Sequence, residues 1–300
     1  MNITRRSHYI PKFYLKNFTV NNLLYEYNKI NGHIEHKSPR GVGWRPNFNI
    51  FIDYHLRKNE GLESFLNFNE DKAAVAIQKI IKNEILIDQE MVDFMVFMSM
   101  IKFRVPKFRR YVKENFLEKE KNDFFIEYKS IKKRKEFIED FNKKTGMNTG
   151  LTADNFFKKV YVSDEAFEDA IFFSYMINNG LNNTKEFIKK DWYFIETHGD
   201  KFFITSDDPL VTLKANTYKL TVLKNINTDN AADLFIFPIS KNLILFLFTN
   251  DLNDEPVFKG RFGLDKTNKV KEINKIIFQE SYNFIYSPNL ETLNMVLYEI

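Results

Sequence analysis

The sequence predicts an α+β fold: an N-terminal β-hairpin and helical half, followed by a mainly antiparallel sheet with C-terminal helices. Apolar residues recur at helical spacing over a subregion from about 62 to 190, whereas short aromatic and β-branched runs fill a β-rich subregion from about 191 to 300. Because these patterns occur in blocks and do not alternate, a parallel βαβ arrangement is disfavoured. We expect a single domain over 1–300, since no repeat, low-complexity tract or linker interrupts the chain.

The N-terminal part carries signals for a short helix and a hairpin. Pro11 suits the first turn of a helix, which predicts a helix over 11–18 (PKFYLKNF). Tyr25 and Tyr27 then alternate with polar residues up to Asn31–Gly32, a pair that tolerates the positive φ angles of a tight primed turn. We therefore expect a β-hairpin that turns at Asn31–Gly32.

Helical periodicity dominates the middle of the chain. The predicted helices span about 62–81, 88–104 and 164–178, and charged helical segments are expected across 107–143. Asp88 is a favourable N-cap for the second helix, and Pro106 is expected to end or kink it. That helix is apolar nearly all round, which predicts a central, buried position. The helix over 164–178 is expected to close at Asn179–Gly180.

Strands are predicted from Trp192 onward. Two apolar runs around His198–Gly199–Asp200 predict a hairpin within 192–206. Further predicted strands span 218–223, 233–239, 242–249 and 283–287, and predicted helices span 265–282 and 290–300. This order is typical of an α+β protein.

Composition excludes several kinds of site. The chain of 300 residues has no cysteine, which rules out disulfides, iron–sulfur clusters, thiolate zinc sites and cysteine nucleophiles. The net charge of +4 permits nucleic-acid binding without indicating it. The longest apolar stretch, 91–103, is shorter than the ~20 residues of a membrane helix, and the first residues lack the apolar core of a signal peptide. We expect a soluble, cytoplasmic protein with no membrane partner.

Short motifs spread along the chain resemble those of one protein family. They are His8-Tyr9-Ile10-Pro11 with Phe13-Tyr14-Leu15, Glu63 with Glu70, Arg104 with Pro106, Trp192, and Ser206-Asp207-Asp208-Pro209. In this order they resemble a large, mainly bacterial family known as domain of unknown function 4238. The chain departs from the family pattern at Lys102, where a glutamine is expected shortly before the arginine. The resemblance implies no reaction, although the presence of such genes in accessory regions of bacterial genomes hints at a defence or toxin role.

Glu63 and Glu70 are the first candidates for chemistry. They are seven residues apart, so they lie two turns apart on one helix face, at the edge of the apolar stripe that includes Leu66 and Ala73. Carboxylates rarely face a core unless they are paired or bind a metal, because their desolvation costs several kcal/mol. Two alternatives follow: the pair reaches solvent or a structural arginine, or it lines a pocket as metal ligands.

Arg104 and His8 are candidate catalytic residues. Arg104 closes the most apolar helix and needs an acceptor, which is either a substrate phosphate or an internal ion pair with Glu63 or Glu70. His8 lies just before the first predicted helix, where it is either a general acid–base with a pKa near neutrality or a capping or core histidine.

Asp207 and Asp208 follow a predicted strand, at a place where a sheet holds side chains rigidly while a loop leaves them accessible. In one interpretation they join a glutamate as oxygen ligands for Mg²⁺ or Mn²⁺. In the other they cap a turn that Pro209 fixes.

Two functions are compatible with these residues. The first is a metal-dependent phosphodiesterase or nuclease with a toxin or phage-defence role. The four carboxylates would bind Mg²⁺ or Mn²⁺, His8 would move a proton, and Arg104 would hold a phosphate of nucleic acid or of a small phosphorylated ligand. The alternative is a non-enzymatic ligand-binding, sensor or interaction module whose polar cluster is structural. Carboxylates that meet across an open pocket favour the enzyme, and closed ion pairs favour the module.

Overall fold

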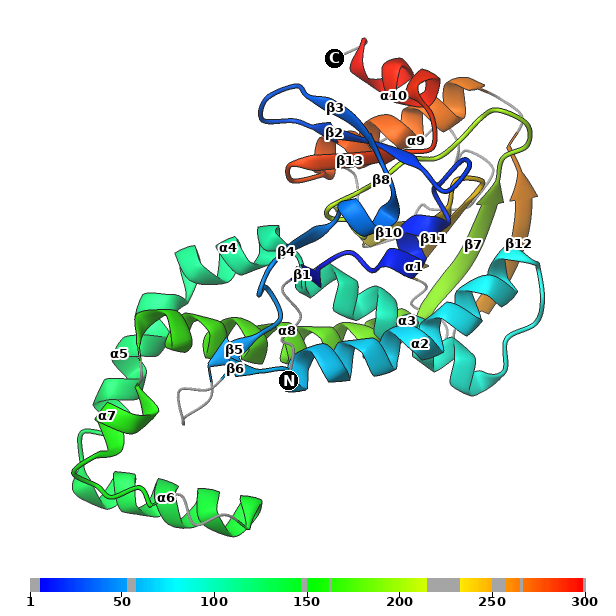
Figure 1. Ribbon diagram of the computed structural model, residues 1–300. Helices are drawn as coiled ribbons and strands as arrows, with labels where there is room; N and C mark the ends of the chain where they lie inside the picture. Colours follow the sequence, from blue (N-terminus) through cyan, green and yellow to red (C-terminus); the bar gives the residue numbers. More distant parts are fainter. Residues whose placement is uncertain are drawn as a thin grey trace.

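The computed structural model describes residues 6–52, 58–146, 150–161, 163–214, 233–249, 257–264 and 267–298. The strand expected at 218–223 lies outside these residues. Within them, an N-terminal hairpin, a block of helices, a mainly antiparallel sheet and C-terminal helices follow one another, which confirms the α+β prediction (Figure 1). No helix in these ranges is long and apolar enough to cross a membrane.

Most strands belong to two sheets. The strands span Arg6–His8 (β1), Leu24–Asn28 (β2), Ile34–Lys37 (β3), Trp44–Pro46 (β4), Phe51–Ile52 (β5), Lys58–Asn59 (β6), Lys190–Glu196 (β7), Thr205–Ser206 (β8), Val211–Lys214 (β9), Asp233–Ser240 (β10), Leu243–Thr249 (β11), Val257–Gly263 (β12) and Phe284–Ser287 (β13). The larger sheet has the order β12–β7–β11–β10–β9, in which β12 and β7 are parallel and the other neighbours antiparallel. The smaller sheet, β3–β2–β13–β8, joins the N-terminal hairpin to a C-terminal strand. Two further ribbons pair β1 with β4 and β5 with β6.

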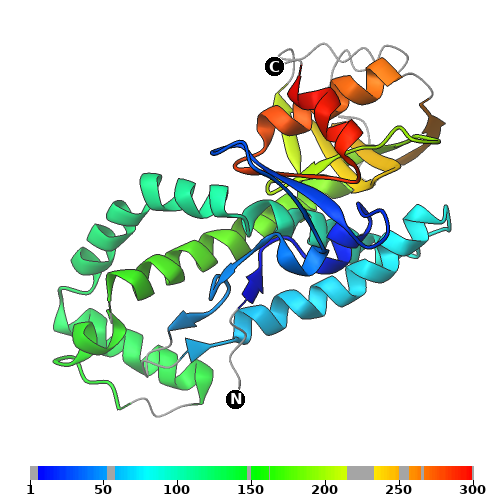
Figure 2. The same ribbon diagram turned by 45° about the horizontal axis from the view of Figure 1, so that its top comes forward.

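The helices form a layer against the larger sheet and an arm that extends from it. They span Lys12–Lys16 (α1), Gly61–Ile81 (α2), Asp88–Phe103 (α3), Pro106–Asn115 (α4), Leu117–Glu127 (α5), Ile131–Thr145 (α6), Phe156–Val160 (α7), Asp164–Ile188 (α8), Thr267–Glu280 (α9) and Leu290–Leu297 (α10), with a 3₁₀ turn at Pro39–Gly41. α3 packs between α2 and α8. α5, α6 and α7 project away from the sheet in both views (Figures 1 and 2).

The larger sheet is covered on both faces. Successive residues of a strand face opposite sides, so Trp192 and Leu245 belong to the core shared with α2 and α3, whereas Ile195 belongs to the core shared with α9. Burial on both sides explains the nearly uninterrupted apolar run of β11. The first core also contains Tyr9 and Tyr286, so the opening segment and β13 pack against it.

The predicted end of a helix at Asn179–Gly180 is wrong, because α8 continues to Ile188. Gly180 faces α3, where an added Cβ atom would lie 2.7 Å from the sulfur of Met100. Its carbonyl oxygen accepts a 2.5 Å hydrogen bond from Ser99 Oγ. Close packing of two helices therefore explains this glycine, and a C-cap does not.

The hairpin predicted within 192–206 is also wrong. β7 pairs with β11 and β12, whereas β8 pairs with β13 in the other sheet, so the segment between them connects two sheets. The N-terminal hairpin is confirmed as β2–β3. Its turn is longer than predicted, because Gly32 alone of the Asn31–Gly32 pair has a positive φ (71°) and its N–H donates to the carbonyl of Asn28.

Candidate functional site

Arg104 is the centre of a buried polar group that we call the Arg104 cluster. This residue caps the C-terminus of α3 and is 2 % exposed. One terminal nitrogen donates a 2.6 Å hydrogen bond to Oε1 of Glu70, and the other donates to the carbonyl oxygen of His8. Asn49 Nδ2 lies 3.4 Å from that same carbonyl oxygen and donates a 2.7 Å hydrogen bond to Glu63. The cluster thus joins the opening segment, α2 and the end of α3.

The internal ion pair predicted for Arg104 is confirmed with Glu70 as the partner. Glu63 and Glu70 both lie half-buried on α2, on either side of the buried Leu66. Burial raises the pKa of Glu63, and the hydrogen bond from Asn49 and the charge of Arg104 offset only part of this shift. Both carboxylates are therefore held by groups of the protein.

His8 contributes its backbone to the Arg104 cluster, while its side chain is half-buried beside it. Burial, followed by the positive charges of Lys12 and Arg104, lowers the pKa of the imidazole to about 4. Such an imidazole is neutral at physiological pH and lies far from the pKa that suits a general acid–base at neutrality. Among the described residues, no hydrogen-bond partner reaches its buried Nε2 atom.

The low pKa of His8 predicts a pH-dependent stability. A histidine whose pKa falls from 6.5 unfolded to about 4 folded binds fewer protons when folded, so the protein loses stability as the pH drops from 6.5 toward 4. Burial raises the pKa of Asp207 to about 6, which has the opposite effect in an overlapping range. The test is therefore the difference in unfolding free energy between wild type and His8→Gln.

The difference in unfolding free energy between wild type and His8→Gln is expected to become smaller as the pH falls from 6.5 to 4. Urea denaturation measures both free energies. The matched control is His33→Gln, because His33 is exposed on the hairpin loop. A constant difference across this range would contradict a buried neutral His8.

Asp207 connects β8 to the chain that enters β13. Its two carboxylate oxygens each accept a 2.9 Å hydrogen bond from a backbone N–H, one of Tyr282 and one of Asn283. Its own N–H donates to the carbonyl of Phe284 at 3.1 Å. Since Asp207 is 1 % exposed, this side chain satisfies backbone donors that would otherwise be buried without partners.

Asp208 lies between two lysines. Lys102 Nζ is 3.2 Å from one carboxylate oxygen, and Lys107 Nζ is 2.9 Å from the other. The same lysines also donate to backbone carbonyls, Lys102 to Leu210 and Lys107 to Glu280, each at about 2.8–2.9 Å. Asp208 is 2 % exposed, so this is a buried carboxylate with two cations that tie the junction of α3 and α4 to the loop after β8.

The two lysines border a hollow of about 350 Å³ that includes Arg110. A cationic hollow of this kind could attract a phosphorylated ligand. These cations are already engaged, because Lys102 and Lys107 share Asp208 and Nε of Arg110 donates a 2.7 Å hydrogen bond to Glu114, although the five side chains together keep one positive charge in excess. A phosphate would have to compete with these two carboxylates for the cations.

The opening segment links the Arg104 cluster to Asp207. The carbonyl of His8 belongs to the Arg104 cluster, and the neighbouring Tyr9 lies close enough to Asp207 for that carboxylate to raise its pKa, after the larger effect of burial. The motif residues other than Trp192 therefore gather at one joint between β1, the end of α3 and the turn after β8. Within the described ranges, however, no three Asp, Glu or His side chains converge as a metal site would require. Glu63, Glu70, Asp207 and Asp208 therefore do not come together as one set of ligands in the described part of the chain.

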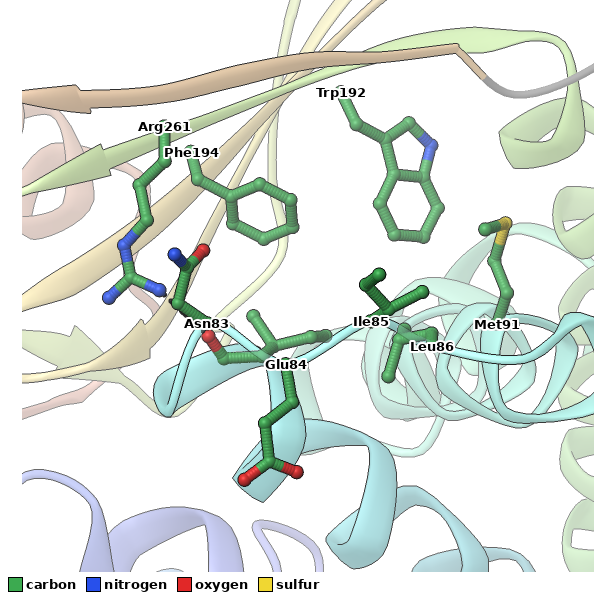
Figure 3. Close-up of a pocket in the computed structure, with 9 residues that line it drawn as sticks. Asn83, Glu84, Ile85, Leu86, Met91, Trp192, Phe194 and Arg261 are labelled. Carbon is green, nitrogen blue, oxygen red and sulfur yellow. Dashed lines mark hydrogen bonds between the residues drawn. The ribbon is translucent and has the colours of Figure 1, made fainter.

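A separate apolar cavity lies between β7 and the loop that joins α2 to α3 (Figure 3). We call it the Trp192 pocket; it has a volume of about 260 Å³. It is lined by apolar side chains with a few polar ones at the side: Ile80, Asn83, Glu84, Ile85, Leu86, Met91, Trp192, Phe194 and Arg261. Trp192 and Phe194 are buried, whereas Ile85 is 90 % exposed. The sequence predicts Trp192 as a strand residue, but no pattern in it predicts this cavity.

The fold and these motifs define an α+β protein with a buried polar joint. The chain belongs to the family described as "Protein of unknown function (DUF4238)", whose model matches residues 6–290. This membership confirms the resemblance seen in the sequence motifs. No curated protein and no solved structure matches the chain.

Proposed function

We propose that this protein is a non-enzymatic ligand-binding module, in which the polar motif residues are structural and a small apolar molecule occupies the Trp192 pocket. The observation that supports it is the pairing of every predicted site carboxylate inside the protein. Glu70 is paired with Arg104, Asp208 with two lysines, Asp207 with backbone donors and Glu63 with an amide. Charges that are matched in this way hold a fold together and leave little capacity for a substrate.

The Trp192 pocket has the character of a binding site for an apolar molecule. Ligand sites are concave and mainly apolar, with a few polar groups that fix orientation. Ile85 supplies an apolar side chain that is 90 % exposed at this pocket, and Ile87 in the same loop is 63 % exposed. An apolar ligand would remove part of this surface from water, which stabilises a complex by ~25 cal/mol per Å² of buried apolar area.

Toluene is a suitable first probe for this pocket. We expect it to perturb the indole N–H signal of Trp192 in a ¹⁵N-correlated NMR spectrum, with Trp44→Phe to assign the two indoles. Ile85→Ser is expected to weaken toluene binding by roughly five- to twentyfold, because less apolar surface would be buried. The free energy of unfolding of Ile85→Ser should stay within about 0.5 kcal/mol of wild type, since the side chain of Ile85 is exposed.

The matched control is Ile126→Ser, which removes a similarly exposed isoleucine (73 %) on α5, in the arm. It should leave toluene binding unchanged. Absence of any toluene effect on Trp192, or equal affinity in wild type and Ile85→Ser, would refute a ligand site in the Trp192 pocket.

Metal-dependent cleavage of phosphodiesters, in a toxin or phage-defence role, stays a prediction of the sequence. The pairing of the carboxylates argues against it. We expect purified protein with Mg²⁺ or Mn²⁺ to cleave RNA and DNA no faster than Glu70→Gln, a variant that keeps a hydrogen-bond acceptor for Arg104. Metal-dependent cleavage that this substitution abolishes would instead support the enzyme.

A further inference from the structure

The hollow beside Asp208, which we call the Arg110 hollow, has the charge of an anion site. Its volume is about 350 Å³, and the charged side chains that line it are Lys102, Lys107, Arg110, Asp208 and Glu114. Three positive and two negative charges leave one positive charge in excess. A concave site with a net charge raises the local concentration of ligands of the opposite sign. The charges of the Arg110 hollow therefore suit a monoanion.

Two of the three cations keep hydrogen-bond donors that a ligand can use. A guanidinium has five N–H donors and an ammonium has three. Nε of Arg110 donates to Glu114 at 2.7 Å and Nη1 donates to the hydroxyl of Tyr282 at 3.3 Å, whereas no acceptor among the described residues engages Nη2. Nζ of Lys107 donates to two oxygen atoms, each at 2.9 Å, so one of its donors is left.

These spare donors are accessible, and the carboxylates beside them are weak competitors. The side chain of Arg110 is 62 % exposed and that of Lys107 is 41 % exposed, and both line the Arg110 hollow. The pair of Arg110 with Glu114 is exposed as well, so water screens it and an anionic ligand exchanges with Glu114 at little cost. Asp208 keeps Lys102 as its partner when Lys107 turns toward a ligand.

The remaining lining of the Arg110 hollow is mainly aromatic. Phe108 and Tyr111 lie one turn apart on α4, and their rings are stacked with 6.2 Å between centroids. Tyr282 adds a third ring from the segment before β13. Tyr111 is 50 % exposed, so part of its surface is free to contact a ligand. Aromatic side chains favour offset or edge-to-face contacts with another ring, which indicates an aromatic ligand.

We infer that the Arg110 hollow binds a small aromatic carboxylic acid as its anion, with the carboxylate at Arg110 and Lys107 and the ring against Phe108 and Tyr111. A carboxylate matches the planar fork of a guanidinium, and its single charge equals the excess charge of the hollow. A phosphate monoester carries about −1.5 to −2 charges at neutral pH and would leave the site negative.

This inference goes beyond the proposed function and does not depend on it. The Arg110 hollow and the Trp192 pocket share no lining residue. Absence of toluene binding would therefore refute the proposed function and leave the Arg110 hollow as a candidate site for an anion.

The test compares benzoate with benzamide, which has nearly the same shape and no charge. Dissociation constants of both are measured by NMR titration at pH 7 on the full-length wild type, Arg110→Gln and Lys132→Gln. Lys132 is the matched control, because it also forms an exposed ion pair four residues along a helix, with Glu136 on α6. We expect wild type to bind benzoate more tightly than benzamide. Arg110→Gln should weaken benzoate binding about fivefold, the upper end for an exposed ion pair, and leave benzamide binding nearly unchanged. Lys132→Gln should change neither.

A second variant has the opposite expected effect. Glu114→Gln removes the carboxylate that competes for Arg110, so benzoate binding should become about two- to fivefold tighter. A loss of packing alone would not strengthen binding. Benzoate should also shift the backbone amide signals of Phe108 and Tyr111, which lie on the face of α4 that lines the hollow.

Three results would each overturn the inference. The first is absence of benzoate binding to wild type. The second is equal affinity of wild type for benzoate and benzamide. The third is a benzoate affinity that neither Arg110→Gln nor Glu114→Gln changes, since the carboxylate would then bind elsewhere.

Discussion

Replacing Arg104 with alanine is expected to lower the free energy of unfolding by about 3–5 kcal/mol. The substitution leaves Glu70 half-buried without its cation and removes a donor from the carbonyl of His8. Breaking a buried ion pair from one side costs more than the pair itself contributes, because the remaining charge stays desolvated. Urea denaturation at neutral pH measures the change.

The matched control for this prediction is Arg110→Ala. Arg110 also pairs with a glutamate, Glu114, but its side chain is 62 % exposed. An exposed ion pair of this kind contributes about 0–1 kcal/mol. If Arg104→Ala costs no more than Arg110→Ala, Arg104 does not hold the joint, and a role in binding substrate becomes the better explanation of its burial.

Replacing Asp207 with alanine is expected to cost about 2–4 kcal/mol, since two buried backbone N–H groups lose their acceptors. These N–H groups belong to Tyr282 and Asn283, which lead into β13, the strand that joins the N-terminal hairpin to β8. Loss of these two hydrogen bonds should therefore destabilise the smaller sheet first. Hydrogen exchange of the β13 amides, together with the unfolding free energy, measures both effects.

The control is Asp200→Ala, because Asp200 is exposed in the turn after β7. It should change stability by no more than about 0.5 kcal/mol. Wild-type stability and unchanged exchange in Asp207→Ala would show that this carboxylate is not needed for the turn, and would make it available for chemistry.

Local patterns in the sequence predict most elements of the fold. They fail where contacts between residues far apart in the sequence determine the structure. The 3.6-residue period located α2 and α3, and alternation located the β2–β3 hairpin. The pairing of β7 with β11 and β12 depends on residues far along the chain, so the hairpin that two neighbouring apolar runs predict does not form. Gly180 has the sequence pattern of a helix end, but it packs against Met100 on another helix, which local sequence does not reveal.

The same distinction applies to the polar residues. The Glu70–Arg104 pair could be predicted, since a carboxylate beside an apolar stripe and a guanidinium at the end of an apolar helix each need a partner. The contact of Lys102 with Asp208 joins residues 106 positions apart, so no local pattern predicts it. Lys102 supplies a positive charge to this buried carboxylate. The Trp192 pocket depends on the space that side chains leave, which periodicity does not describe.

The central claim is that the polar motif residues are structural and do not bind a metal. The most direct measurement is the melting temperature of the wild-type protein with and without millimolar Mn²⁺, because a ligand that binds only the folded state raises the melting temperature. We expect no change. A rise that disappears in Glu63→Gln or Glu70→Gln would contradict the claim and would place a metal at the Arg104 cluster.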